Sequence, residues 1–381
     1  RNAADAIPDE TDIVVDGTFS MGAQETIGSL AGGGRVILGG TLTVGRNGKS
    51  TSFPGDFAAG GTIVKTGTGR FDIVSSVTNN GVYIVNGGTL AFSGNGRQLT
   101  TNASTTAYTL YDGGTLLLDN SEINDIDRLA GPLRGITFQG GTFQFIGKAG
   151  EASGEELGPA TFGLGASEMD VVNGAGPGSS SEIRFSAAVP GYGTINFAAS
   201  NGTLGAPGDN PRVYFTSGMA TGAVVSYATV GNAPAFYDAT YGIRAYTIVE
   251  GNEFDGTAVQ TSLDTVYTVN NNHLPLTVAR TIKSIWIDSP GEGYAVDLGS
   301  AGAYTLTVSS GGINLTGADD FAFVRSGSSS AYLLRGGNQP LYVGVADPGA
   351  TLRMGVPIVN GSGGLYKDGA GALELDALNT F

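Results

Sequence analysis

A short glycine-rich motif recurs through the first part of this chain: two glycines, then threonine, then an aliphatic or aromatic residue. The copies are Gly39-Gly40-Thr41-Leu42, Gly60-Gly61-Thr62-Ile63, Gly87-Gly88-Thr89-Leu90, Gly113-Gly114-Thr115-Leu116 and Gly140-Gly141-Thr142-Phe143. They follow one another at nearly regular intervals. Periods of about 20–50 residues are typical of stacked units that bury their apolar faces only against their neighbours, and every interval here falls in that range. Because each copy places turn glycines before a short strand, the spacing predicts a β-solenoid.

The residues between the glycines favour strands over low-complexity sequence. Glycine accounts for 64 of the 381 residues, about 17% where about 7% is usual. Apolar and polar residues alternate between the glycines, as they do in half-buried strands. The alternating segments are 34–44, 62–74, 82–92, 108–118 and 136–146. Leu116, Leu117 and Leu118 form a continuous apolar run, which predicts a strand covered on both faces.

Charge excludes several classes of partner. Acidic residues outnumber basic ones by 34 to 19, and the net charge is −15. Nucleic acids and anionic membranes bind through a basic face, so neither is expected as a partner. No run approaches the roughly 18–20 apolar residues of a membrane-spanning helix, so we expect no membrane insertion by this segment. Cysteine is absent, which is compatible with export because stacked strands form a long core without disulfides.

His273 is the only histidine, and it follows three asparagines. A histidine-dependent catalytic triad would have to use it, yet no Gly-x-Ser-x-Gly motif accompanies it. A metal site made of several histidines or cysteines is impossible with one histidine and no cysteine. We therefore favour a loop histidine, and we predict no catalytic residue, no cofactor-binding residue and no histidine or cysteine metal site.

Clustered carboxylates could mark a polysaccharide-cleaving β-helix, which would need them together on one exposed face. Asp319 and Asp320 lie near Arg325, but two neighbours in a strand point to opposite faces of the sheet. A second group, Asp9, Glu10, Asp12 and Asp16, precedes the regular repeats and suits a cap or a joint. Neither group favours an enzyme.

A third acidic group is made of Asp119, Glu122, Asp125 and Asp127, whose oxygens could bind Ca²⁺. The Gly-Gly-x-Gly-x-Asp repeat of calcium-binding β-rolls is missing. Solvated loop residues or turn caps are therefore favoured, and Ca²⁺ stays an open alternative.

A longer internal match sharpens the repeat pattern. Residues 61–73 (GTIVKTGTGRFDI) align without gaps to residues 363–375 (GGLYKDGAGALEL). The shared corner residues are Lys65, Gly67 and Gly69 in the first copy and Lys367, Gly369 and Gly371 in the second. Glycine permits positive φ where the chain turns to the next face, so both copies predict two strands joined by a tight corner.

This pattern resembles the autotransporter-associated β-strand repeat of large bacterial passenger proteins. The likeness extends over about residues 60–381 through the order of its segments, from 113–128 and 136–145 to Phe236-Tyr237-Asp238 and Ile358-Val359-Asn360-Gly361. Residues 1–59 resemble the family only in the general character of their sequence. The resemblance implies a right-handed parallel β-helix, all-β and rod-like with some longer loops, exported to the bacterial cell surface.

The resemblance also sets the expected organisation. We expect residues 1–59 to form N-terminal rungs or a cap, and residues 60–381 to form passenger-type repeats continuous with them. The family pattern would run beyond the last residues into another Gly-Gly-Thr strand. Phe381 is therefore expected at a cut or processed boundary.

Aromatic residues concentrate between positions 212 and 254, and Tyr214, Phe236, Tyr237 and Tyr241 are candidates for surface binding. Such rings could form a platform on which sugars stack. Core packing or a lateral flap is favoured over this alternative, because part of the block belongs to the family's module.

Together these observations predict an extracellular structural or adhesive β-helix, a stiff scaffold for surface attachment or cell–cell contact. Its expected partners are surface glycans or matrix proteins, and itself or flanking repeats through end-to-end β-stacking. Two alternatives stay open. One is a filament or sheath subunit assembled by that stacking, and the other is a β-helix that binds or cleaves polysaccharide.

Overall fold

The computed structural model contains no helix in the residues it describes, and more than half of those residues lie in strands. The described residues are 5–99, 104–231, 233–247, 266–269, 273–287, 293–299, 302–327, 331–335, 340–359 and 363–380. The chain divides into two compact units, residues 1–221 with 237–244 and residues 222–236 with 245–381.

Successive strands of the first unit take three positions in turn. β5 (Arg35–Leu38), β6 (Thr41–Val44) and β7 (Thr51–Phe53) are followed by β8 (Asp56–Ala58), β9 (Thr62–Lys65) and β10 (Arg70–Ile73). β5 pairs with β8, β6 with β9 and β7 with β10, in each case parallel. One circuit of the chain therefore makes one rung of three strands, and the next circuit stacks on it. The predicted all-β parallel β-helix is confirmed, while its right-handed sense stays a prediction.

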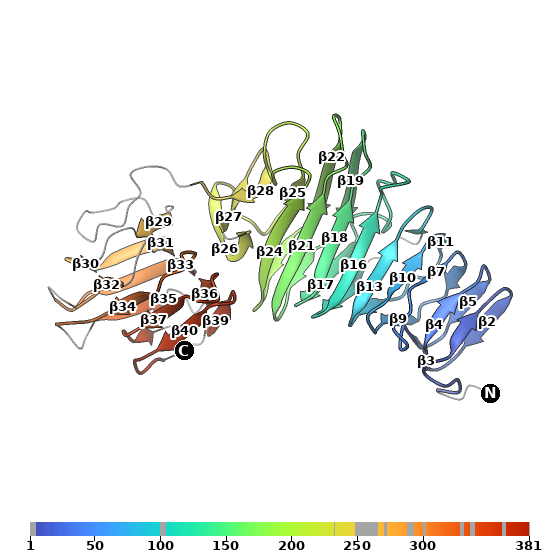
Figure 1. The fold of residues 1–381 in the computed structure, drawn as a ribbon, viewed down its shortest axis with the longest axis horizontal. Coiled ribbons are helices and arrows are strands. Elements are labelled where there is room, and N and C mark those ends of the chain that lie inside the picture. The colour runs from blue at the N-terminus through green and yellow to red at the C-terminus, as the bar shows by residue number, and fades with distance from the viewer. Residues whose placement is uncertain are drawn as a thin grey trace. The chain divides into compact units, whose positions relative to one another are not determined.

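β6 and β9 belong to what we call the first face, an eight-stranded sheet in the order β23-β20-β17-β15-β12-β9-β6-β3. Its other strands are β3 (Glu25–Ile27), β12 (Tyr83–Val85), β15 (Ser104–Tyr111), β17 (Arg134–Gln139), β20 (Ala160–Phe162) and β23 (Ala188–Pro190). On the second face β7 and β10 are followed by β13 (Gly88–Phe92), β16 (Gly114–Asp119), β18 (Thr142–Ile146), β21 (Ala166–Val172) and β24 (Thr194–Ser200). These strands lie side by side in Figure 1.

The third face is made of shorter pieces. They are β2 (Thr18–Met21) with β5 and β8, β11 (Ser76–Val77) with β14 (Arg97–Gln98), and β19 (Ala152–Leu157) with β22 (Ser180–Phe185) and β25 (Arg212–Phe215). Between β14 and β19 in chain order, residues 120–133 form no strand. Near the N-terminus, β1 (Asp12–Val14) pairs with β4 (Ser29–Ala31).

Inward side chains of the first unit form ladders from rung to rung. Along the first face the register joins Leu42 to Ile63, Ile63 to Tyr83 and Tyr83 to Tyr108, and all four residues are fully buried. The rings of Tyr83 and Tyr108 stack with their centres 5.1 Å apart. Burial of such side chains is the main favourable term in folding. The run 116–118 is also buried throughout, as its continuous apolar sequence predicted.

The glycine-rich repeat does not stay on one face. Thr41 pairs with Thr62 on the first face, whereas Thr89, Thr115 and Thr142 pair in sequence on the second face. The step from the second copy to the third therefore covers one rung and one further face. The motif marks the beginning of a strand after a corner, and its spacing equals the rung length only where two copies share a face.

The described strands continue across the boundary expected near residue 59, because β6 pairs with β9. The expected division into 1–59 and 60–381 stays a prediction. The two compact units divide elsewhere: β26 (Ala223–Val230) belongs to the second unit, and β27 (Ala233–Asp238) and β28 (Gly242–Ala245) each contain residues of both.

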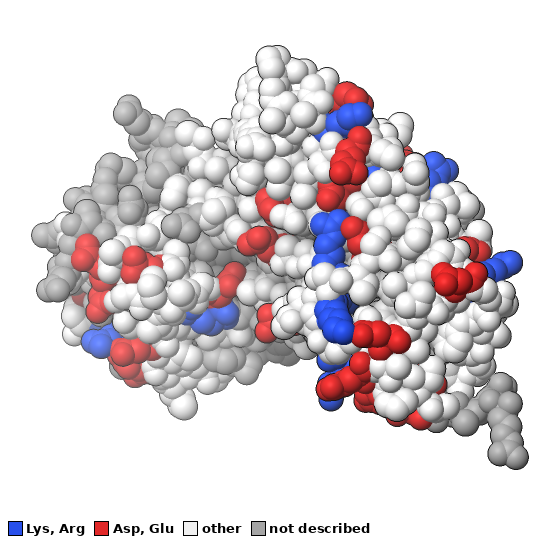
Figure 2. Space-filling model, turned by 45° about the vertical axis from the view of Figure 1, so that its right-hand side comes forward, with Lys and Arg blue, Asp and Glu red and all other residues white. Residues whose placement is uncertain are grey.

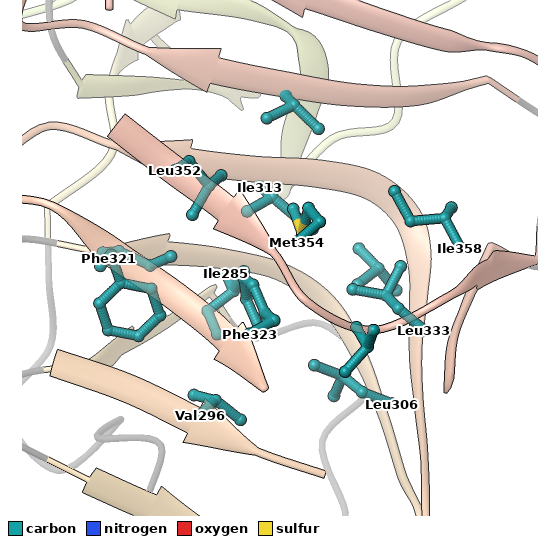
Figure 3. Close-up of a cluster of buried hydrophobic side chains, with 14 of the residues drawn as sticks. Ile285, Val296, Leu306, Ile313, Phe321, Phe323, Leu333, Leu352, Met354 and Ile358 are labelled. Atoms are coloured by element: carbon teal, nitrogen blue, oxygen red, sulfur yellow. The ribbon is translucent and has the colours of Figure 1, made fainter. Parts of the chain in front are cut away.

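The second unit has its own three-position circuit. β35 (Tyr332–Arg335), β36 (Leu341–Val345) and β37 (Thr351–Met354) are followed by β38 (Ile358–Val359), β39 (Leu365–Asp368) and β40 (Ala372–Leu375), which pair with them in parallel. Earlier strands are β29 (Val266–Val269), β30 (His273–Pro275), β31 (Arg280–Ile287), β32 (Tyr294–Asp297), β33 (Thr305–Leu315) and β34 (Phe321–Val324). Their inward residues form one apolar cluster, in which Ile285, Phe323 and Met354 are fully buried (Figure 3).

Candidate functional site

Lys65 closes the corner between β9 and β10. Its Nζ donates hydrogen bonds to the carbonyl oxygens of Thr66 at 2.6 Å, Gly67 at 3.1 Å and Gly87 at 3.2 Å, and the side chain is fully buried. Burial lowers the pKa of Lys65 to about 8. Because Gly87 precedes the next strand of the stack, this one ammonium group ties together two successive rungs.

Lys367 makes the same corner between β39 and β40. Its Nζ donates to the carbonyl oxygens of Asp368 and Gly369, both at 2.7 Å. Gly369 has a φ of 80°, and Gly67 at the first corner has a φ of 69°, values that glycine adopts without steric cost. Lys367 is exposed, unlike Lys65. The two copies of the motif thus share one way of turning, in which a lysine caps the carbonyl groups that follow it.

The last glycine of each corner allows close approach of the rung before it. A Cβ atom on Gly69 would lie 2.3 Å from the carbonyl oxygen of Lys49, and a Cβ on Gly371 would lie 2.3 Å from that of Asp347. Both distances are too short for real atoms. The glycines of the motif therefore serve stacking, and the corner is structural.

The predicted surface aromatics lead to a row of outward side chains on β19, β22 and β25. The register places Glu156 beside Arg184, and Arg184 beside Tyr214. The guanidinium carbon of Arg184 lies 4.3 Å from the centre of the Tyr214 ring, within the range of a cation–π contact. Arg184 Nε also donates to Glu182 Oε1 at 2.6 Å. Two contacts thus hold this arginine against the tyrosine.

A second row runs beside the first. Arg212 is in register with Glu182, and its guanidinium carbon lies 5.8 Å from the centre of the Tyr241 ring. Tyr241 is positioned by a turn, in which Asp238 Oδ1 accepts the backbone N–H groups of Thr240 at 2.8 Å and Tyr241 at 3.1 Å. Like Tyr214, Tyr241 is half-buried.

The turn also connects the two rows, because Tyr214 donates its hydroxyl hydrogen to the carbonyl oxygen of Thr240 at 2.7 Å. We call Arg184, Tyr214, Arg212 and Tyr241 the arginine–tyrosine ladder. Burial raises the pKa of Tyr214, so its hydroxyl stays a proton donor at neutral pH. The ladder presents two aromatic rings and two guanidinium groups on one lateral face of the first unit.

The other two predicted aromatics do not join this surface. Tyr237 is 7% exposed, donates its hydroxyl hydrogen to the carbonyl oxygen of Phe215 at 2.6 Å and accepts the Phe215 N–H at 3.0 Å. Phe236 belongs to the second unit and packs against Tyr246, with the ring centres 5.9 Å apart. Neighbours in a strand point to opposite sides, so Phe236 and Tyr237 could not both face outward. Tyr237 is therefore not a surface-binding residue, and core packing, the interpretation favoured for this aromatic block, applies to it.

Sequence reasoning missed the two arginines of the ladder. Glu156, Arg184 and Tyr214 are distant from one another in the chain, and nothing in the local sequence marks either arginine. Only the rung register brings these positions together. A search for charged and aromatic residues separated by about one rung would have found them.

The acidic group considered for Ca²⁺ is not brought together. Asp119 accepts from Ser121 and lies 3.5 Å from Arg70, while Asp125 lies 3.6 Å from Arg97. In the part of the chain that the structure describes, no three His, Cys, Asp or Glu side chains are grouped so that they could hold a metal ion. The described side chains of this acidic group therefore do not converge on one point.

Two of the other acidic candidates, Asp12 and Asp320, have local partners. Asp12 accepts from Lys49 and from Ser29, both at 2.6 Å, and these hydrogen bonds, with Lys49 first, lower the pKa of Asp12 to about 2. Asp320 accepts the Thr351 N–H at 2.7 Å. The side chain of His273 lies outside the described residues.

Asp320 lines a shallow trough of about 520 Å³ in the second unit. The trough holds Arg353 in place of the expected Arg325, because Arg353 follows one rung later. Arg353 Nε donates to Glu374 at 2.7 Å and lies 3.3 Å from Asp376. Among the described residues that line it, the trough thus has one acidic side chain, Asp320, and one arginine. That arginine is already paired with the acidic side chains of Glu374 and Asp376.

Basic and acidic side chains are interspersed over the face shown in Figure 2. None of the described residues belongs to a helix long and apolar enough to cross a membrane. Comparisons with known protein families, with curated proteins and with solved structures found no match.

Proposed function

We propose that this chain is a structural and adhesive β-helix of a bacterial surface protein, related to the autotransporter-associated repeats that its sequence resembles. In this proposal it acts outside the cell as a stiff stack of rungs whose lateral faces make contacts. We propose no chemical reaction for it, and surface glycans or matrix proteins as its partners.

The observation that supports the proposal most is the register of the first unit. On the second face the pairing runs without interruption from β7 to β24, and the inward side chains are buried along it. In such a stack each rung is held by its neighbours, so the outward positions form fixed rows. Rows of this kind suit presentation of side chains to a large partner.

The arginine–tyrosine ladder is the contact surface that we assign to glycans. Tyrosine rings offer apolar faces on which a pyranose can stack, and guanidinium groups donate hydrogen bonds in a fixed fork to hydroxyl or carboxylate oxygens. The contacts between the side chains restrict their motion before any ligand arrives, which reduces the entropy lost on binding.

A glycan array tests this assignment. The wild-type chain is expected to bind a subset of glycans, and the double variant Tyr214→Ser, Tyr241→Ser is expected to lose at least about 90% of that signal, since each stacked ring contributes on the order of 1 kcal/mol. Tyr192→Ser is the matched control, because Tyr192 is a tyrosine of the same unit with 58% exposure. Equal binding by the wild type and the double variant would contradict the role of the ladder.

Self-association is a second candidate function, favoured by the exposure of β40. Leu373 and Leu375 are in register with Leu352 and Met354, which are fully buried, yet Leu375 is 40% exposed. Leu378 is 89% exposed. Among the described residues no strand pairs with the outer side of β40, and exposed apolar side chains beside such an edge favour addition of another strand, which we propose comes from a second copy.

Sedimentation velocity over a range of concentrations tests this second candidate. Stacking predicts larger species at high concentration, and Leu375→Asp should return the chain to monomer because it places a charge in the stacking surface. A wild-type chain that stays monomeric at every concentration would exclude it.

A further inference from the structure

A lateral groove of about 620 Å³ lies where residues 120–133 replace a strand of the third face. One wall comes from the β11–β14 region, with Arg97 and Leu99, and the other from the segment Ile123, Asn124, Asp125 and Ile126. This groove is separate from the arginine–tyrosine ladder, since the two share no residue.

The wall made by residues 123–126 is held in place by buried polar groups. Arg128 is fully buried, and its guanidinium donates to the carbonyl oxygens of Gly96 at 2.6 Å and Ile123 at 2.7 Å. Arg128 also contacts Asn120, whose amide donates to the carbonyl oxygen of Asp125 at 2.9 Å. A buried guanidinium without such partners would be costly, so these bonds fix the segment to the stack.

The rung below and the rung above also hold this segment. Glu155 of β19 is 2% exposed and accepts the backbone N–H groups of Arg128 and Leu129, both at 2.9 Å. On the other side, Gln98 of β14 donates its N–H to the carbonyl oxygen of Arg128 at 2.6 Å. Residues 128–129 thus occupy the rung position between β14 and β19, and residues 121–127 project from a fixed base.

Exposed apolar side chains line both walls of the groove. Ile126 is 67% exposed, Leu99 is 46% exposed and Ile123 is 40% exposed, and all three line the groove. Single exposed apolar residues are common on proteins, but several around one groove on a fixed segment are typical of a surface that binds another macromolecule. Aliphatic side chains do not stack sugars as aromatic rings do, so this groove favours a protein ligand.

Charge beside the groove, on residues that do not line it, selects among protein ligands. Arg97 is the one basic lining residue among those the structure describes, and it pairs with Asp125 at 3.6 Å. Glu122 and Asp127 lie on the same segment and are exposed. Partial burial first, and the charges of Asp125 and Glu156 after it, raise the pKa of Asp127, so part of this shift reflects repulsion between acids. A basic ligand would relieve this repulsion.

We propose that this groove binds a segment of another protein in which apolar side chains alternate with lysine or arginine. The apolar side chains would contact Leu99, Ile123 and Ile126, and the basic ones would pair with Glu122 and Asp127. The proposal goes beyond glycan contact, because it names a different site and a different class of partner.

The test uses fluorescence anisotropy of the full chain with three short synthetic peptides. In the first peptide leucine alternates with lysine, in the second leucine alternates with glutamate, and in the third serine alternates with lysine. Only the first is expected to bind saturably. Ile126→Ser should weaken its affinity about tenfold, and Glu122→Gln with Asp127→Asn should weaken it and flatten its dependence on salt.

Leu164→Ser is the matched control, because Leu164 is 61% exposed in the same unit but does not line the groove. The control should bind the first peptide as the wild type does, and circular dichroism should show that all variants fold. Equal affinity of Ile126→Ser and the wild type would overturn the proposal, as would binding of the second peptide as tight as the first. Glycan binding should be unchanged in Ile126→Ser, so the two sites can fail separately.

Discussion

Replacement of Lys65 by methionine separates the two opposing effects of a buried ammonium group. Methionine keeps most of the apolar stem but removes the charge and all three hydrogen bonds to carbonyl oxygens. Loss of the charge stabilises the fold, because folding no longer has to remove water from an ammonium group. Loss of the hydrogen bonds destabilises it. The sign of the change in the free energy of unfolding shows which effect is larger.

The structure allows both magnitudes to be worked out. A pKa lowered from 10.5 to about 8 corresponds to a desolvation cost of about 3 kcal/mol for the charged form, since each pH unit is worth about 1.4 kcal/mol. Hydrogen bonds to a charged group contribute about 1.5–3 kcal/mol each, or about 4.5–9 kcal/mol for three. The residues Thr66, Gly67 and Gly87 are only half-buried, so water replaces part of this loss. We expect Lys65→Met to lower the free energy of unfolding at pH 7 by about 1–3 kcal/mol.

The difference should also depend on pH. Between about pH 8 and pH 10.5 the folded lysine loses its proton while the unfolded lysine keeps it. The unfolded state then binds more protons, so the stability of the wild type rises with pH in this window, by up to about 3 kcal/mol. The variant lacks this titrating group. The difference between its free energy of unfolding and that of the wild type should therefore grow over the same pH window.

Urea titrations followed by far-UV circular dichroism at several pH values measure this difference. Lys367→Met is the control, because Lys367 makes two of the same hydrogen bonds at an exposed corner. Exposed substitutions usually stay within about 0.5 kcal/mol. A Lys65→Met variant as stable as the wild type at pH 7 would refute the view that carbonyl capping outweighs desolvation.

Other substitutions test the close approach of the rungs and the base of the groove. Gly88→Ala should lower the melting temperature strongly, at a cost above about 2 kcal/mol, because its Cβ would lie 2.4 and 2.5 Å from two carbonyl oxygens of the preceding rung. Gly113→Ala, with a similar positive φ but no atom within 4 Å of the new Cβ, should cost only about 1 kcal/mol. Glu155→Gln should cost about 1–3 kcal/mol in urea titrations, because the amide nitrogen would face one of the two N–H groups that the carboxylate accepts. A Gly88→Ala variant with the same melting temperature as Gly113→Ala would contradict the stacking geometry. So would a Glu155→Gln variant with the same free energy of unfolding as the wild type.

Much of the fold could be predicted from the sequence, because the repeat contains residues that determine the backbone conformation. The motif at Lys65 and its copy at Lys367 place glycine where φ is positive and where the previous rung comes close. Alternation of apolar residues then gives the inward ladders. The same information could not show that the glycine-rich repeat changes face, since a corner has the same local sequence on either face.

The lateral sites could not be predicted, because they depend on register across rungs of unequal length. Arg184 and Tyr214 are separated by a whole rung of chain yet are neighbours in the sheet. The groove depends on Arg128, which reads as an ordinary polar loop residue but is fully buried. Tyr237 shows the converse case, since an aromatic residue considered for surface binding lies in the core.

Stacked rungs of the first unit place outward residues in fixed rows. One such row on the outer side of the second face is Ser52, Asp72, Ala91, Leu117, Gln144, Asp170 and Ala198, of which Ala91 and Leu117 are covered by other parts of the unit. The chain contains no cysteine, so Ser52→Cys with Ala198→Cys allows specific spin labelling at the two ends.

Double electron–electron resonance between these labels is the most direct test. Six strand spacings of about 4.8 Å predict a separation of about 29 Å between the two Cα positions, with a narrow distribution. A separation beyond about 40 Å, or a distribution without a maximum near the predicted value, would contradict the stacking and the lateral surfaces that depend on it.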